Sequence, residues 1–420
     1  MPDRVLPASD RRRSGRRHVE DPELSISITK RLGGLAIATA LVVGACSSGG
    51  ASTAPSAAPS SAAPSAAASA SADASAAAIT YRCTKADGQL NGAGSTFIFP
   101  LLSKMGEDYN TKCGVKLNYQ SIGSGGGVKQ WTANTVDFGA SDAYLADTEI
   151  AAAASNGEPV EIPTTFGAVV VAYHLPALTG ALTMTPDIIA NIFLGKITKW
   201  NDAAIAAANP GVTLPTMDIS VVHRSDGSGT TSIFTKYLSA VSPDWVTTVG
   251  GGDPNKSGAK EVEWPVGLGA SGNEGVTQGI NQTDGGVGYI ELAYALKNSI
   301  PFATVINKAG NPIVPTLDSV KAAADLPSYP ADLRFDLVNT DSPQGYPITG
   351  TTWLIVYKDL SKVLKTQDRA NALVDFLWWA IHEGQAATAP LYYGAVPAGL
   401  LAQDEAAVKS INWAGTPLLP

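Results

Sequence analysis

The chain has 420 residues, 45% of them hydrophobic, so it is long enough to fold as two domains with buried cores. Its 37 acidic residues outnumber 29 lysines and arginines, and the net charge is -8. This charge argues against nucleic acid or another polyanion as a partner. A small anion is compatible with it, because a few backbone amides and one arginine can hold such a ligand.

Residues 1–46 are typical of a signal peptide. The apolar stretch 32–43 follows two basic residues and is about a dozen residues long, too short to span a bilayer. It runs into Val-Gly-Ala-Cys, which resembles the lipobox of bacterial lipoproteins, so we expect Cys46 to carry lipid. The alternative, a buried helix beside a chance cysteine, stays open.

Residues 47–78 consist almost entirely of serine, alanine, proline and glycine. They have too few large apolar groups to offset the entropy lost on ordering, so we expect a flexible tether. About 30 such residues reach on the order of 30 Å. A tether of this kind would hold a folded receptor close to a membrane partner.

Cys83 and Cys113 are the cysteines left once Cys46 is assigned to lipid. In an exported, oxidising setting we expect them to pair in a disulfide. Two free thiols are the alternative.

From residue 79 onward, short apolar runs alternate with helical patterns, which indicates an α/β fold. Helix starts are indicated at Thr185, which is followed by a proline, and at Asp202, which opens an alanine-rich run ending at 209–211. We find no internal repeat and no heptads. The candidate strands are 115–122, 136–140, 167–173, 219–223 and 352–357.

Three glycine-rich loops, at 92–97, 123–127 and 224–230, each precede a helical pattern. Glycine lets the backbone approach a ligand closely, serine and threonine supply hydroxyl donors, and the first N–H groups of a helix are unpaired. Each loop alone is more often simple turn chemistry. Together, the three predict a site for a tetrahedral oxyanion; none has the pattern of a nucleotide-binding loop.

The sequence contains no H-E-x-x-H motif and no serine in a G-x-S-x-G elbow. Of the four histidines, His223 beside Arg224 could line the edge of a site. A secreted phosphatase would need an activated nucleophile or a metal cluster, and neither grouping is visible. We therefore expect no enzyme activity, no cofactor and no metal site.

At these loops the chain resembles the phosphate-binding proteins of bacterial phosphate ABC importers. The matching stretches follow the family's order and cover most of the chain after residue 79. They are GAGSTF (92–97), YQSIGSGGGVKQ (119–130), NTVDFGASDAYL (134–145), FLGKITKWNDAAI (193–205), HRSDGSGTTSIFTKYL (223–238), GVGYIELAYA (286–295) and YPITGTTWLIVY (346–357).

The resemblance implies a two-lobed periplasmic-binding-protein fold of type II, an α/β fold with two interlobe crossovers and the ligand in the cleft. One lobe would hold residues 79–170 plus 346–420, and the other residues 171–345. The lobes would close on inorganic phosphate and deliver it to the transmembrane permease subunits of the importer. The receptor would be lipid-anchored on the extracytoplasmic face and would not bind nucleic acid.

The resemblance also implies the ligand set. Asp226 matches the acid that orients the binding arginine, and Gly125 departs from the second serine of many relatives, so one hydroxyl contact is in doubt although a backbone amide there could substitute. The implied phosphate contacts are Thr96, the Phe97 amide, Ser124, Asp142, Arg224, Ser228, Gly229 and Thr230.

Asp142 is the implied source of selectivity, since it is an acceptor among donors. Phosphate near neutral pH still carries a proton to donate, whereas sulfate carries none and would face the carboxylate with like charge. One alternative is that Asp142 only caps a helix. For the protein as a whole, the alternative functions are a receptor for a different tetrahedral oxyanion and a phosphate-scavenging surface protein without a transporter.

Overall fold

A computed structural model describes residues 81–420, so the expectations for the signal segment, Cys46 and the tether lie outside the described residues. The central element is an eight-stranded mixed sheet of order β2-β1-β3-β11-β4-β8-β6-β7. Its strands are β1 (Gln89–Gly94), β2 (Lys116–Ser121), β3 (Phe138–Ser141), β4 (Pro159–Tyr173), β6 (Ser220–Arg224), β7 (Leu268–Ala270), β8 (Gly286–Glu291) and β11 (Thr349–Tyr357).

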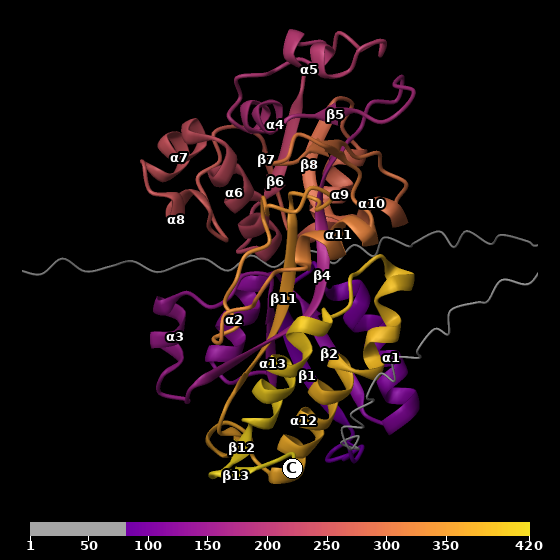
Figure 1. Ribbon diagram of the computed structural model, residues 1–420. Helices are drawn as coiled ribbons and strands as arrows, with labels where there is room; N and C mark the ends of the chain where they lie inside the picture. Colours follow the sequence, from indigo (N-terminus) through magenta and orange to yellow (C-terminus); the bar gives the residue numbers. More distant parts are fainter. Residues whose placement is uncertain (1–80) are drawn as a thin grey trace, which may run out of the picture. The chain divides into compact units, whose positions relative to one another are not determined.

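Helices flank this sheet (Figure 1). They are α1 (Phe99–Cys113), α2 (Ser124–Thr132), α3 (Asp147–Ala153), α4 (Pro186–Phe193), α5 (Ala203–Ala208), α6 (Gly229–Val241), α7 (Pro243–Gly250), α8 (Pro254–Ser257), α9 (Gly272–Asn281), α10 (Leu292–Lys297), α11 (Leu317–Ala324), α12 (Gln367–Ile381) and α13 (Ala398–Lys409). The short elements are β5 (Thr183–Met184), β9 (Thr304–Ile306), β10 (Pro312–Ile313), β12 (Asn412–Trp413), β13 (Thr416–Pro417), η1 (Leu360–Lys362), η2 (Glu383–Ala387) and η3 (Ala389–Leu391). Within residues 81–420, no helix combines the length and apolar character needed to cross a membrane.

Strand β4 exchanges partners midway. Its residues up to Ala168 pair with β11, and its residues from Val169 onward pair with β8, both antiparallel. We call β2, β1, β3, β11 and the start of β4 the first half-sheet, and the end of β4 with β8, β6 and β7 the second half-sheet. The chain enters the second half-sheet along β4 and returns at the start of β11 (Figure 1). This is the two-lobed periplasmic-binding-protein fold with two crossovers.

The loops of interest follow parallel strands. In the first half-sheet β1 pairs in parallel with both β2 and β3, and in the second β6 pairs in parallel with β7 and β8. Parallel strands need crossover connections, usually helices, and their carboxyl ends lie at the same edge. The segments that follow β1, β2, β3 and β6 therefore start at the ends of the half-sheets where a ligand is commonly bound.

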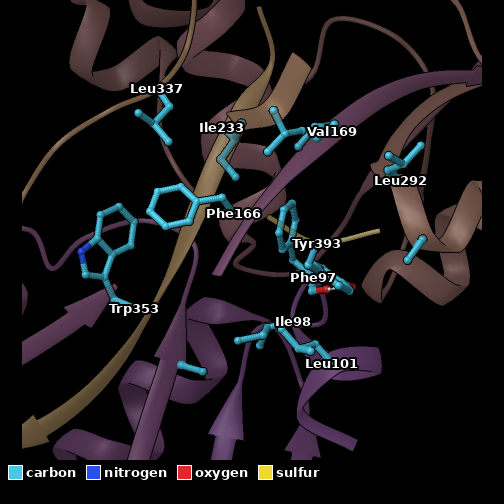
Figure 2. Close-up of a cluster of buried hydrophobic side chains, with 14 of the residues drawn as sticks. Phe97, Ile98, Leu101, Phe166, Val169, Ile233, Leu292, Leu337, Trp353 and Tyr393 are labelled. Carbon is cyan, nitrogen blue, oxygen red and sulfur yellow. Dashed lines mark hydrogen bonds between the residues drawn. The ribbon is translucent and has the colours of Figure 1, made fainter. Parts of the chain in front are cut away.

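A continuous hydrophobic cluster joins the two half-sheets (Figure 2). The cluster includes Phe166 and Val169 of β4, Ile233 of α6 and Trp353 of β11, which Figure 2 labels. A Cβ at Gly167 would lie 2.6 Å from the Phe97 ring, so β4 can pass the first loop only with glycine there. The core thus fixes one site loop directly against the crossover strand.

The structure confirms the two helix starts. Thr185 accepts a hydrogen bond from the Ile188 N–H at the start of α4, and Asp202 caps α5 in the same way. All five candidate strands overlap observed ones, but β4 begins at Pro159, well before the expected strand at Gly167. The segment before Gly167 contains Pro163, which lies at the register shift of the β4–β11 ladder, where a missing N–H is tolerated.

The segment before β11 packs on the first half-sheet. The Trp353 indole N–H donates to the Leu333 carbonyl at 2.8 Å, and the Phe335 ring lies 5.5 Å from the Trp353 ring. Residues 333–335 therefore contact β11, although the expected boundaries group them with the other lobe.

Candidate anion-binding site

The first loop connects β1 to α1 and is held to β3. Gly94 has φ +142°, and a Cβ there would lie 2.0 Å from the Ala140 carbonyl oxygen, so only glycine fits. The Ser95 hydroxyl accepts hydrogen bonds from the N–H groups of Phe97 (3.0 Å) and Ile98 (3.3 Å). The same hydroxyl donates to Asp142 at 2.5 Å, so the loop fixes that carboxylate.

Asp142 is buried and its two oxygens are bonded unequally. Oδ1 accepts from the hydroxyls of Ser95 (2.5 Å) and Thr352 (2.6 Å), whereas Oδ2 accepts a long hydrogen bond of 3.4 Å from Ser124. Burial raises the pKa of Asp142 to about 6, while these hydroxyls and the charge of Arg224 oppose the rise. Oδ2 thus keeps capacity for another donor, and the group is mostly ionised at neutral pH.

The second loop brings α2 against the third loop. Ser124, the first residue of α2, accepts hydrogen bonds from the N–H groups of Asp142 (3.2 Å) and Gly229 (3.0 Å). The Gly125 N–H donates to the Gly227 carbonyl at 2.8 Å, so this amide is already engaged. A Cβ at Gly125 would lie 3.0 Å from the Gly227 Cα. The second and third loops can therefore approach this closely because residue 125 is a glycine.

Arg224 ends β6 in the third loop and is paired with Asp226. Its Nε and Nη2 donate to the two Asp226 oxygens at 2.7 and 2.5 Å, and its side chain is 1% exposed. Burial alone would raise the pKa of Asp226, but Arg224 and the Gly272 N–H hold it below its ordinary value. Nη1 of Arg224 is buried without a hydrogen-bond partner among residues 81–420, which leaves a charged donor for an anion.

The third loop ends at the N-terminus of α6. The Ser228 hydroxyl caps this helix by accepting from the Thr231 N–H at 3.0 Å. A Cβ at Gly229 would lie 2.5 Å from the Asp142 Cβ, so glycine allows the helix start to reach Asp142. The first turn of α6 therefore faces the end of β3, and a helix N-terminus favours negative charge.

The structure brings the residues expected to form the site together, from both half-sheets. Gly229 meets Ser124, which in turn meets Asp142, and Arg224 contributes a favourable charge to that carboxylate. Thr96 and Thr230 are joined through Asn273. The Phe97 N–H is also close by, but it is bonded to Ser95.

Sequence reasoning missed three buried residues of this cluster: Ser95, Thr352 and Asn273. The first two lie in GST and GTT, motifs of small hydroxyl residues within stretches that matched the family. Asn273 lies in Gly-Asn-Glu-Gly at the start of α9, a fourth glycine-containing turn before a helix. That turn was the available signal.

Two further observations bear on the chemistry. In residues 81–420 no group of three His, Cys, Asp or Glu side chains could hold a metal ion. At the C-terminal end of α1, Cys113 forms a disulfide with Cys83, and the two Cα atoms are 5.0 Å apart.

A two-lobed α/β frame with glycine-rich loops from both halves around a buried Arg224–Asp226 pair defines a binding protein of the periplasmic type. A family model described as the PBP superfamily domain matches residues 63–382. The phosphate-binding protein PstS of Xylella fastidiosa (strain 9a5c) is 42% identical over 323 residues, 76% of this chain and 84% of that protein. PstS of Pasteurella multocida is 38% identical over 334 residues, 79% and 93% of the two chains.

The chain therefore belongs to the PstS family of phosphate-binding proteins within the PBP superfamily. A solved structure of a phosphate-binding protein from Stenotrophomonas maltophilia matches with a TM-score of 0.58 at 20% identity. It covers 76% of this chain and 92% of that chain, and the match shows a common fold.

Proposed function

We propose that the protein binds inorganic phosphate between the two half-sheets, delivers it to the membrane subunits of an ABC phosphate importer, and catalyses no reaction. Membership of the PstS family, whose members bind substrate without converting it, supports this function. The observation that carries it is Asp142, a buried acceptor in a site of donors, with one oxygen open to a further hydrogen bond.

Inorganic phosphate fits such a site better than sulfate. At neutral pH phosphate carries a proton that it can donate to Asp142, and the remaining oxygens can accept from the surrounding donors. Sulfate would place an oxygen lone pair against the carboxylate in a buried setting, without a hydrogen bond to offset the repulsion. Rejection through an unpaired buried group reaches about 10⁴-fold in favourable cases.

The proposed contacts are the residues that the sequence predicted. Arg224 would supply a full-charge contact through Nη1, held in position by Asp226. The other contacts would be Thr96, the Phe97 amide, Ser124, Asp142, Ser228, Gly229 and Thr230, all of which are buried or lie at a helix start. The Phe97 N–H and the Ser124 hydroxyl would exchange their present hydrogen bonds to Ser95 and Asp142 for bonds to the anion.

Calorimetry of the purified protein tests this function. We expect phosphate to bind with one site per chain, and a large excess of sulfate to leave the affinity unchanged. Arg224→Ala should weaken binding by orders of magnitude, because the anion would lose its charge-assisted hydrogen bond. Absence of phosphate binding by the parent, or release of phosphate from added esters, would contradict the proposal.

We propose that residues 79–170 plus 346–420 form one lobe and residues 171–345 the other, with the segment around residues 333–335 of the second lobe packing across onto β11. The exchange of β4 partners between Ala168 and Val169 supports the first boundary, and the start of β11 at Thr349 supports the second. Closure of these lobes on phosphate would create the form that the transmembrane subunits recognise.

The location that we propose is the extracytoplasmic face of the membrane. The signal-like segment 1–46, lipidation at Cys46 and the tether 47–78 would anchor the receptor there, and the sequence pattern supports this. A Cys83–Cys113 disulfide suits the same oxidising setting. Metabolic labelling with a radioactive fatty acid should label the parent protein and leave the Cys46→Ala variant unlabelled. An unlabelled parent protein would contradict the proposed lipid anchor.

A further inference from the structure

Asn273 lies at the start of α9 and bridges the first and third loops. Its side chain is fully buried. The Asn273 Nδ2 group donates to the hydroxyl oxygens of Thr96 at 2.8 Å and Thr230 at 3.1 Å. The Asn273 backbone N–H donates to the same Thr96 oxygen at 3.1 Å. One amide side chain therefore contacts two hydroxyls from opposite half-sheets.

The orientation of the Asn273 amide is fixed by a third contact. Its Oδ1 accepts a hydrogen bond from the Glu291 N–H at 2.9 Å. An N–H group cannot donate to an NH₂ group, so the oxygen must face Glu291 and the nitrogen must face the threonines. Hydrogen-bond chemistry therefore sets the direction of the amide.

This arrangement dictates what the threonine hydroxyls can do. A hydroxyl has two acceptor lone pairs and one proton, and Thr96 Oγ1 already accepts two N–H groups. Thr230 Oγ1 accepts one. In the described part of the chain neither hydroxyl donates to a protein acceptor, so each has a proton to donate elsewhere. Thr96 can act toward an approaching anion only as a donor.

We propose that Asn273 is a positioning residue for phosphate: it commits the Thr96 and Thr230 hydroxyls to donate to the anion without touching the anion itself. The inference rests on the proposed function and deepens it. Since Asn273 and Thr230 come from the second half-sheet and Thr96 from the first, Thr96 is fully committed only when the two halves meet. A ligand that must receive protons, such as an oxyanion, is favoured over one that must donate them.

A double-mutant cycle between Asn273→Ala and Thr96→Val tests this role through phosphate calorimetry. Each single change should weaken phosphate binding roughly 10- to 100-fold, the value of one hydrogen bond to a charged partner. In the Thr96→Val background, Asn273→Ala should weaken binding much less, because the hydroxyl that it positions is gone. Equal factors in both backgrounds would indicate a merely structural residue and overturn the proposal.

A second variant keeps the test decisive if Asn273→Ala does not fold. Asn273→Asp retains the oxygen that accepts from Glu291 but turns a donor into an acceptor, so both hydroxyls should donate to Asp and away from phosphate. The negative charge added by Asn273→Asp weakens phosphate binding with either threonine or valine at position 96. The double-mutant cycle therefore cancels this charge effect and leaves the coupling between residues 273 and 96. Asn281→Asp, at the exposed end of α9, adds the same charge and should leave binding unchanged.

Failure of the two claims is distinguishable. A parent protein that binds no phosphate would refute the proposed function. A parent that binds, with Asn273 and Thr96 variants acting independently, would refute the role of Asn273 alone.

Discussion

Among single residues, Asp142 is the one whose protonation state we expect to determine which anion the site accepts. Burial raises its pKa to about 6, so the group is ionised above that pH and protonated below it. A protonated Asp142 can donate to sulfate, which removes the repulsion. We therefore predict that sulfate competes with phosphate increasingly as the pH falls from about 8 to about 5.

Competition calorimetry across this pH range measures the effect. The comparison with Asp142→Asn is the control, since its sulfate competition should lack the step near pH 6. A sulfate affinity of the parent that stays constant across the range would argue against titration of Asp142.

Asp404 of α13 is a second buried carboxyl group, and its burial should make the stability of the protein depend on pH. Both of its oxygens are buried without hydrogen-bond partners in the described region, and burial raises its pKa to about 9. In the unfolded chain the pKa is about 3.9, so between these values the folded state holds a proton that the unfolded state releases. The free energy of unfolding therefore falls as the pH rises through this window.

Replacement of Asp404 by Asn or Leu should remove that pH dependence and stabilise the protein by about 1 to 3 kcal/mol at neutral pH. Thermal melts of the parent and the variants at several pH values provide the measurement. Parallel curves for parent and variants would show that the carboxyl group has a partner.

Among the elements, α3 is linked to the third loop through Lys260, which is not itself one of the proposed anion contacts. Glu149 accepts from Lys260 Nζ at 2.5 Å and from the Ala146 N–H at 2.9 Å. The Lys260 carbonyl accepts from the Ser228 N–H at 3.0 Å. Lys260 therefore holds the start of α3 with its side chain and the third loop with its backbone.

We predict that Lys260→Met accelerates phosphate release about 2- to 10-fold, because a partly exposed ion pair across the two halves contributes a modest free energy. Lys196→Met is the matched control, since the Lys196–Asp244 pair is more exposed and lies away from the anion loops. Stopped-flow dissociation compares them. Release from Lys260→Met at the rate of the control would exclude a role for the pair.

An element could be predicted from the sequence where residues close to it in the chain determine its structure. The caps at Thr185 and Asp202 and the glycine-rich loops were predictable because neighbouring residues determine them. The early start of β4 was missed because Pro163 interrupts its apolar pattern, and a bulge against β11 accommodates it. Asn273 was missed because its partners are distant in sequence and no local pattern reports them.

At the scale of the whole described region, the site depends on contacts between the two half-sheets. Ser124 meets Gly229, Gly125 meets Gly227, and Asn273 meets Thr96. The proposed phosphate donors come from both half-sheets, so binding should favour the form in which the halves touch. We predict that saturating phosphate lowers the radius of gyration measured by solution scattering, whereas sulfate at neutral pH leaves it unchanged. Equal dimensions in all three conditions would contradict coupling between binding and closure.

We attribute the specificity of this site for phosphate to the buried carboxylate of Asp142, and the Asp142→Asn variant isolates that carboxylate. Phosphate titrations of parent and variant, with and without excess sulfate at neutral pH, give the result in one series. We expect sulfate to leave phosphate binding by the parent unchanged, and the folded variant to lose this discrimination, because the amide can donate to sulfate. A folded Asp142→Asn protein that excludes sulfate as well as the parent does would show that the carboxylate is not the source of selectivity and that Asp142 has a structural role.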